Sequence, residues 1–135
     1  MKLYVATPAY GQMVTAQYLV GILKLANEHQ GGVVVRTHSS SVVHTARNML
    51  AKSFLESDAD ALLFIDADMQ FSPEETIWPL IAAKKDVVGV GCAMKKIDWS
   101  QVKAAADRGC EDLEPWGLTL NVELGGKSDF AVDND

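Results

Sequence analysis

Short apolar runs alternate with longer stretches of helical spacing along most of the chain. A strand buried on both faces of a parallel sheet is a nearly continuous apolar run, whereas a surface helix repeats its apolar residues every three or four positions. On this basis we predict strands at residues 2–7, 33–36, 61–66, 87–91 and 116–124. We predict helices at residues 13–29, 42–57, 73–83 and 100–108. Strands that alternate with helices favour an α/β fold, a three-layer α/β/α arrangement with a mostly parallel sheet.

The sequence contains neither an internal repeat nor a linker that would divide it. Its 135 residues are enough to bury a sizeable core, so we expect a single domain over residues 1–124. The net charge of −6 comes entirely from residues 107–135, because residues 1–106 carry ten acidic and ten basic side chains. The acidic, glycine-containing residues 125–135 are expected to form a disordered tail. Residues 94–99 are expected to form a loop.

Composition excludes several classes of function. Basic residues do not cluster as they do in nucleic-acid-binding proteins, so no nucleic-acid partner is expected. No apolar run is long enough for a transmembrane segment, and the chain enters a strand at once without a signal-peptide layout. We therefore expect a cytoplasmic protein. Cys92 and Cys110 lack metal-ligand spacing and are expected to be reduced thiols.

The strongest chemical signal is Asp66-Ala67-Asp68, which follows four apolar residues. Open α/β sheets bind ligands at the carboxyl ends of their strands, which is where this motif falls. Carboxylates two positions apart on a strand share a face, and such hard oxygen ligands suit Mg²⁺ or Mn²⁺ together with substrate phosphates. The alternative is an ordinary turn at the end of a strand, where aspartate is common.

Other families with an aspartate at a strand end fit less well. A Walker B aspartate requires a P-loop of the form GxxxxGK[ST], which this sequence lacks. A dinucleotide site requires GxGxxG after the first strand, where this chain has TPAYGQ at residues 7–12. A haloacid-dehalogenase-like phosphatase would carry its nucleophilic aspartate after the first strand, and no acid is found there.

Four motifs in order resemble those of GT-A-fold glycosyltransferases, most closely the family-2-like enzymes of phage and environmental genomes. They are TPAYG at residues 7–11, TARN at 45–48, FIDADMQFSP at 64–73 and KKIDW at 95–99. The resemblance covers about residues 3–105. It implies a Rossmann-like GT-A sheet and a metal-dependent hexosyltransferase-like enzyme that uses a nucleotide-diphosphate sugar, most simply a UDP-sugar, and an unidentified acceptor.

The resemblance also implies roles for the loop after the first strand. Thr7, Pro8, Ala9 and Tyr10 would bind the nucleoside part of the donor. The Tyr10 ring could stack on the base, or it could be an aromatic residue packed at the edge of the sheet.

The other implied roles concern the phosphates and the metal. Arg47 would reach the nucleotide or its phosphate, because a guanidinium suits paired oxygens, unless it is a solvated helix residue. Asp66 and Ala67 would contact the donor. Asp66 and Asp68 would hold Mn²⁺ or Mg²⁺. Lys95 could steady the phosphates or be solvated.

The chain is short for this family, and we assign no catalytic base. Glu111, Asp112 and Glu114 follow a turn and are interpreted as solvated surface acids. Three hypotheses remain: a glycosyltransferase, a nucleotide-sugar-binding domain without transfer activity, and another phosphate-metal enzyme such as a nucleotidyltransferase. Elements missing from the sheet would leave apolar surface exposed, so a homo-oligomer is expected.

Overall fold

The computed structural model describes residues 1–120, apart from the side chains of Lys95 and Leu120. By its internal contacts the chain divides into two units, Met1–Asp86 and Val87–Asp135, and each is described by itself. The expectation of one domain over residues 1–124 stays a prediction. The expected tail at residues 125–135 lies outside the described residues.

The first unit contains a three-stranded parallel sheet in the order β2-β1-β3. Its strands are β1 (Leu3–Pro8), β2 (Val33–His38) and β3 (Ala61–Phe64). Its helical elements are α1 (Ala16–Glu28), α2 (Val43–Leu55), and a π-helix (Pro73–Ile77) that continues into α3 (Trp78–Ala82). The predicted α/β class is therefore confirmed for this unit.

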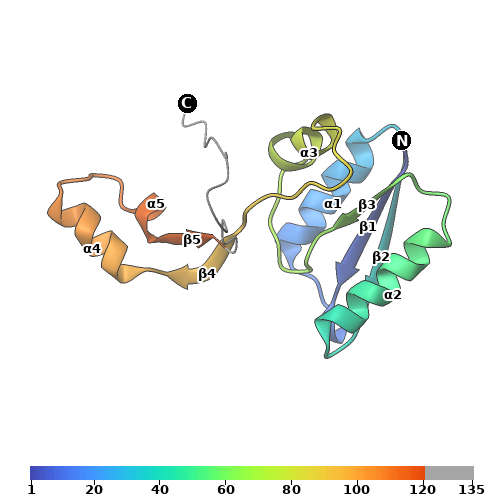
Figure 1. The fold of residues 1–135 in the computed structure, drawn as a ribbon, viewed down its shortest axis with the longest axis horizontal. Coiled ribbons are helices and arrows are strands. Elements are labelled where there is room, and N and C mark those ends of the chain that lie inside the picture. Colours follow the sequence, from blue (N-terminus) through green and yellow to red (C-terminus); the bar gives the residue numbers. More distant parts are fainter. Residues whose placement is uncertain (121–135) are drawn as a thin grey trace. The chain divides into compact units, whose positions relative to one another are not determined.

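The two faces of β1 carry two separate clusters of buried side chains. Leu3 and Val5 pack with Ile22 and Leu25 of α1, and Ile77 of the π-helix joins the same cluster. On the other face, Tyr4 and Ala6 pack with Leu50 of α2. Alternate residues of a strand point to opposite faces, so the apolar β1 is buried from both sides. Figure 1 shows α1 and α3 on one side of the sheet and α2 on the other.

Thr7 continues the face of β1 that α1 covers. Its side chain is fully buried, and its hydroxyl is hydrogen bonded to the Tyr18 hydroxyl. Burial raises the pKa of Tyr18 above its ordinary value of 10.0, and the hydrogen bond to Thr7 offsets part of that rise. The charged phenolate is disfavoured there because it would lose its hydration.

This shift predicts a loss of stability at alkaline pH. The folded state holds the Tyr18 proton more tightly than the unfolded state, so its stabilisation is complete below pH 10.0 and is lost as pH rises through the raised pKa. Between about pH 9 and pH 11, the free energy of unfolding measured in urea should fall less in Tyr18→Phe than in the wild type. Tyr10→Phe, on an exposed ring, is the control and should keep the decline. An identical decline in Tyr18→Phe would contradict the assignment.

The described part of the second unit, residues 87–120, contains a short antiparallel strand pair and two helices. They are β4 (Ala93–Ile97), α4 (Trp99–Asp107), α5 (Glu114–Gly117) and β5 (Leu118–Leu120). Asp98 caps α4 by accepting hydrogen bonds from the backbone of Ser100 and Gln101. The Ser100 hydroxyl, above all, lowers the pKa of the Asp98 carboxyl by hydrogen bonding to it.

The predictions for this second unit were partly wrong. Residues 87–91 do not form a strand, and the expected loop at 94–99 is largely β4. Gly89 and Gly91 weaken the apolar run because glycine gives a strand no side chain to pack, and Val87 is 91% exposed. Residues 93–97 become a strand because they pair with β5, which is a contact that local pattern does not reveal.

Several boundaries also differ from expectation. The first helix begins at Ala16 rather than residue 13, because Thr15 caps it. The third strand ends at Phe64, before Asp66. Of the strand expected at 116–124, residues 116–117 belong to α5, 118–120 form β5, and 121–124 lie outside the described residues. None of the helices in the described part is both long and apolar enough to cross a membrane.

Candidate functional site

A cavity of about 460 Å³ lies at the carboxyl ends of β1 and β3. The expected residues that line it are Pro8, Tyr10, Asp66, Ala67 and Asp68. The residues that sequence reasoning missed are Met13, Val14, Thr15 and Val43. Three segments far apart in the sequence therefore meet at one edge of the sheet, as expected for a ligand site in an open α/β fold.

The loop after β1 presents an aromatic ring to this cavity. Residues Tyr10–Gln12 form a single helical turn in which Gly11 has φ 66° and Gln12 has φ 60°. Glycine adopts this left-handed conformation without steric cost, which lets the chain turn back toward α1. The turn leaves Tyr10 73% exposed at the cavity. An exposed ring in this position is suited to stacking on a planar ligand.

Asp66 forms an ion pair with Arg47 of α2. The Arg47 Nη2 lies 2.9 Å from Asp66 Oδ1, and the guanidinium also lies 5.9 Å from the centre of the Phe64 ring. The two side chains are 46% and 48% exposed. An ion pair this exposed contributes about 0–1 kcal/mol to stability, so it is weak enough to be exchanged for other partners. The structure thus brings together two residues that the sequence had marked separately.

The loop that carries the two aspartates is tied to the start of α1. The Thr15 backbone N–H donates to the Ala67 carbonyl oxygen at 2.9 Å, and the Met69 N–H donates to the Asp66 carbonyl oxygen at 3.1 Å. The Thr15 hydroxyl accepts a hydrogen bond from the Tyr18 backbone and so caps α1. Thr15 therefore positions the aspartate loop, and a threonine directly before a helical pattern was the available signal.

Of the other expected residues, Arg47 contacts Asp66 but does not itself line the cavity, and Thr7, Ala9 and Lys95 bring no described side chain to it. Thr7 is buried beneath α1, where it is bonded to Tyr18. Ala9 is 1% exposed, and its N–H donates to the His38 carbonyl oxygen. Lys95 lies in β4 of the second unit, and its side chain is outside the described part. The side chains of Thr7 and Ala9 are therefore buried, and neither lines the cavity.

Comparison with known proteins gives no assignment. No family model, no curated protein and no solved structure matches the chain. The functional proposal therefore depends on the residues of the site and their geometry.

The chemistry of the carboxylates fits a hard divalent cation. Asp66 and Asp68 both line the cavity. Within residues 1–120, no group of three or more His, Cys, Asp or Glu side chains is arranged to hold a metal. A cation held by these two carboxylates would take its other ligands from water and from a bound phosphate. Mg²⁺ and Mn²⁺ are commonly held in this way, by one or two carboxylates together with substrate phosphates.

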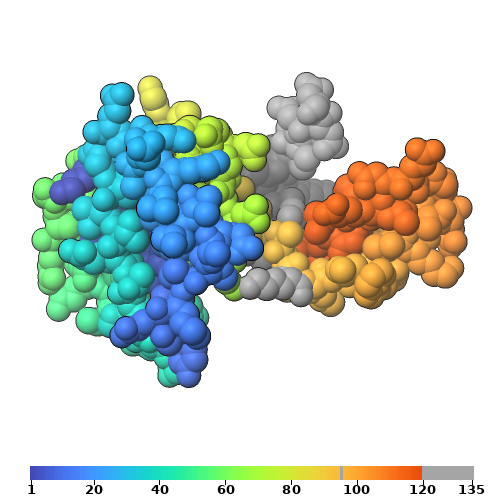
Figure 2. Space-filling view, turned by 180° about the vertical axis from the view of Figure 1, so that it is seen from behind, coloured from blue at the N-terminus to red at the C-terminus, as the bar shows by residue number. Residues whose placement is uncertain are grey.

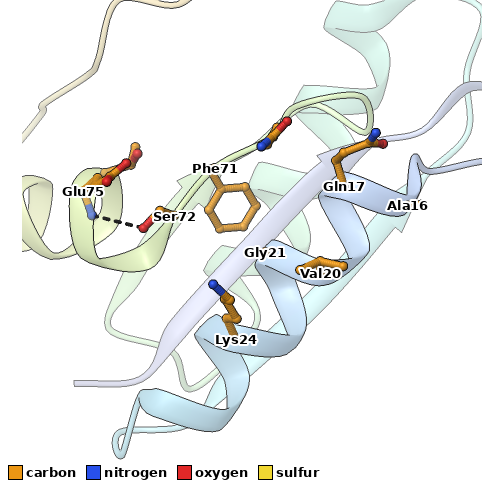
Figure 3. A pocket seen from close by; sticks show the side chains of 10 residues that line it. Ala16, Gln17, Val20, Gly21, Lys24, Phe71, Ser72 and Glu75 are labelled. Atoms are coloured by element: carbon orange, nitrogen blue, oxygen red, sulfur yellow. Dashed lines mark hydrogen bonds between the residues drawn. The ribbon is translucent and has the colours of Figure 1, made fainter.

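A second cavity, of about 720 Å³, lies between α1 and residues 70–76 (Figure 3). The Phe71 ring packs so closely on Gly21 that a Cβ there would lie 2.7 Å from it. Ser72 accepts a hydrogen bond from the Glu75 backbone and caps the π-helix. In Figure 2 the blue and light-blue atoms of α1 form much of the near face of the first unit. These contacts fix the segment that follows Asp68 against α1.

Proposed function

We propose that this chain is a metal-dependent glycosyltransferase with a GT-A-like fold and a nucleotide-diphosphate sugar donor, most simply a UDP-sugar. The observation that carries the proposal is the placement of Asp66 and Asp68 at the carboxyl edge of a parallel sheet, in one cavity with the exposed Tyr10 ring. Helices on both faces of the sheet support the proposed three-layer arrangement. The resemblance of four ordered motifs supports the same class.

Four residues of the cavity, together with Arg47 beside it, have defined tasks in this proposal. Tyr10 stacks on the base, and Pro8 forms the neighbouring wall. Asp68, with Asp66, would hold Mn²⁺ or Mg²⁺, and Arg47 lies beside Asp66, where its guanidinium can bind a phosphate oxygen. The bound cation would offset the negative charge that develops on the departing nucleoside diphosphate. We assign no base for the acceptor hydroxyl.

A calorimetric titration of UDP tests the proposal. With Mn²⁺ present we expect binding, and with chelator we expect the affinity to fall about tenfold or more, because the diphosphate charge is no longer neutralised. GDP, CDP and dTDP titrated under the same conditions identify the base. If none of the four nucleotides binds with Mn²⁺ present, the proposed site is wrong.

A second assay separates transfer from binding. Release of UDP from a UDP-sugar in the presence of Mn²⁺ would establish the enzyme, either by hydrolysis or by transfer to an added acceptor. Metal-dependent binding without release of UDP from any donor would favour a nucleotide-sugar-binding domain.

A further inference from the structure

The ion pair between Arg47 and Asp66 bears on the order in which ligands enter the cavity. We propose that Arg47 is a built-in counter-ion that competes with the divalent cation for Asp66, and that the diphosphate removes Arg47 from this carboxylate. This inference rests on the proposed function of the site. It makes the binding of cation and nucleotide cooperative, with Arg47 as the residue that couples them.

Arg47 lies on α2, one helical turn after Val43, and Val43 lines the cavity. Residues four apart on a helix share a face, so Arg47 lies at the edge of the same cavity. Its Nη2 lies 2.9 Å from Asp66 Oδ1. Both side chains are about half exposed, so each can exchange its partner without being pulled from a core.

The positive charge of Arg47 weakens Asp66 as a metal ligand. A carboxylate oxygen that accepts a hydrogen bond from a guanidinium is a poorer ligand for a divalent cation, because the two positive charges would repel each other at close range. While Arg47 holds Asp66, this carboxylate is therefore a weaker ligand for the cation than it would be without Arg47.

The diphosphate of the nucleotide is a better partner for Arg47 than Asp66 is. A diphosphate can accept two parallel hydrogen bonds from a guanidinium, whereas the Asp66 contact given by the structure joins one nitrogen to one oxygen. Arg47 can therefore move to the diphosphate and release Asp66 for the cation. By linkage, the nucleotide must then raise the affinity for the cation by the same factor by which the cation raises the affinity for the nucleotide.

Binding of Mn²⁺, followed by the electron paramagnetic resonance signal of the free ion, tests this inference. The wild type should bind Mn²⁺ weakly alone and more tightly with UDP present. Arg47→Met should bind Mn²⁺ alone roughly three- to tenfold more tightly, and UDP should strengthen that binding less than in the wild type. Titrations without protein correct for Mn²⁺ bound by UDP in solution.

Two further variants serve as controls. Lys52→Met removes an equal charge from α2 at an exposed residue that pairs with Glu56, and it should leave Mn²⁺ binding unchanged. Arg47→Lys lacks the planar pair of donors but keeps the positive charge. Because the charge is kept, the affinity of this variant for Mn²⁺ alone should stay close to that of the wild type. Because Arg47 is exposed, circular dichroism should show that both of its variants are folded.

The outcomes separate this inference from the proposed function. If the wild type shows UDP-enhanced Mn²⁺ binding and Arg47→Met has the same Mn²⁺ affinity and the same enhancement, Arg47 is not the coupling residue and the inference is wrong. In that case the proposed function stands. Absence of Mn²⁺ binding in all variants, with or without UDP, would overturn both.

Discussion

Replacing Asp68 by alanine should raise the dissociation constant for UDP in the presence of Mn²⁺ by roughly a hundredfold or more. Loss of an outer-shell partner of a metal ligand already costs about ten- to a hundredfold in metal affinity, and Asp68 is proposed as a direct ligand. The calorimetric titration measures this change. Residual binding in the variant should no longer respond to chelator, because the cation has lost one of its two proposed carboxylate ligands.

Asp58→Ala is the matched control for this prediction. It removes the same charge from the other end of β3, where Asp58 pairs with Lys2. The Lys2 contact lowers the pKa of Asp58, so the substitution removes a carboxylate that is ionised at neutral pH. UDP affinity should not change in this control. An equal loss in Asp58→Ala and Asp68→Ala would show that general electrostatics, rather than metal ligation, governs binding.

Replacing Leu25 by alanine should lower the free energy of unfolding by about 2–5 kcal/mol, the range for leucine deletions in a close-packed core. Leu25 is 0% exposed in the cluster between α1 and the sheet. For a small domain this is a large part of the total stability. Urea denaturation followed by circular dichroism should show a lower midpoint with little change in slope.

Leu23→Ala on the same helix provides the comparison. Leu23 is 61% exposed, so the same deletion should cost well under 1 kcal/mol. If both variants lose equal stability, then the outer face of α1 is also covered in solution, for instance by a second copy of the chain. Light scattering at high micromolar concentration would then be the next measurement.

The sequence was sufficient to predict the elements whose signal is local. β1, β2, α1 and α2 follow directly from apolar periodicity. The Asp66–Asp68 turn follows a strand as expected, but that strand, β3, lies at the edge of the sheet and is only partly buried rather than buried on both faces. The meeting of Tyr10 and Asp66 at one cavity could also be anticipated, because parallel strands end at the same edge of the sheet.

The larger failures concern contacts between distant residues. Residues 87–91 have a stronger strand pattern than residues 93–97, yet only the latter find a partner in β5. The hydrogen bond from Thr15 to Ala67 spans 52 residues, and the burial of Thr7 depends on the position of Tyr18. The pattern of apolar and polar residues along the sequence cannot predict these contacts, because the stability of a strand or a loop depends on what packs against it.

The order of the strands has a consequence for the synthesis of this protein. β1 is the central strand, and Leu3 pairs with Val33 on one side and with Ala61 on the other. Of these three strands β1 leaves the ribosome before the two strands that pair with it, and the described sheet is complete only after β3 has emerged. Such non-local parallel pairing folds slowly and leaves apolar segments exposed in the meantime. We therefore expect the nascent sheet to stay incomplete until about residue 65 has left the ribosome.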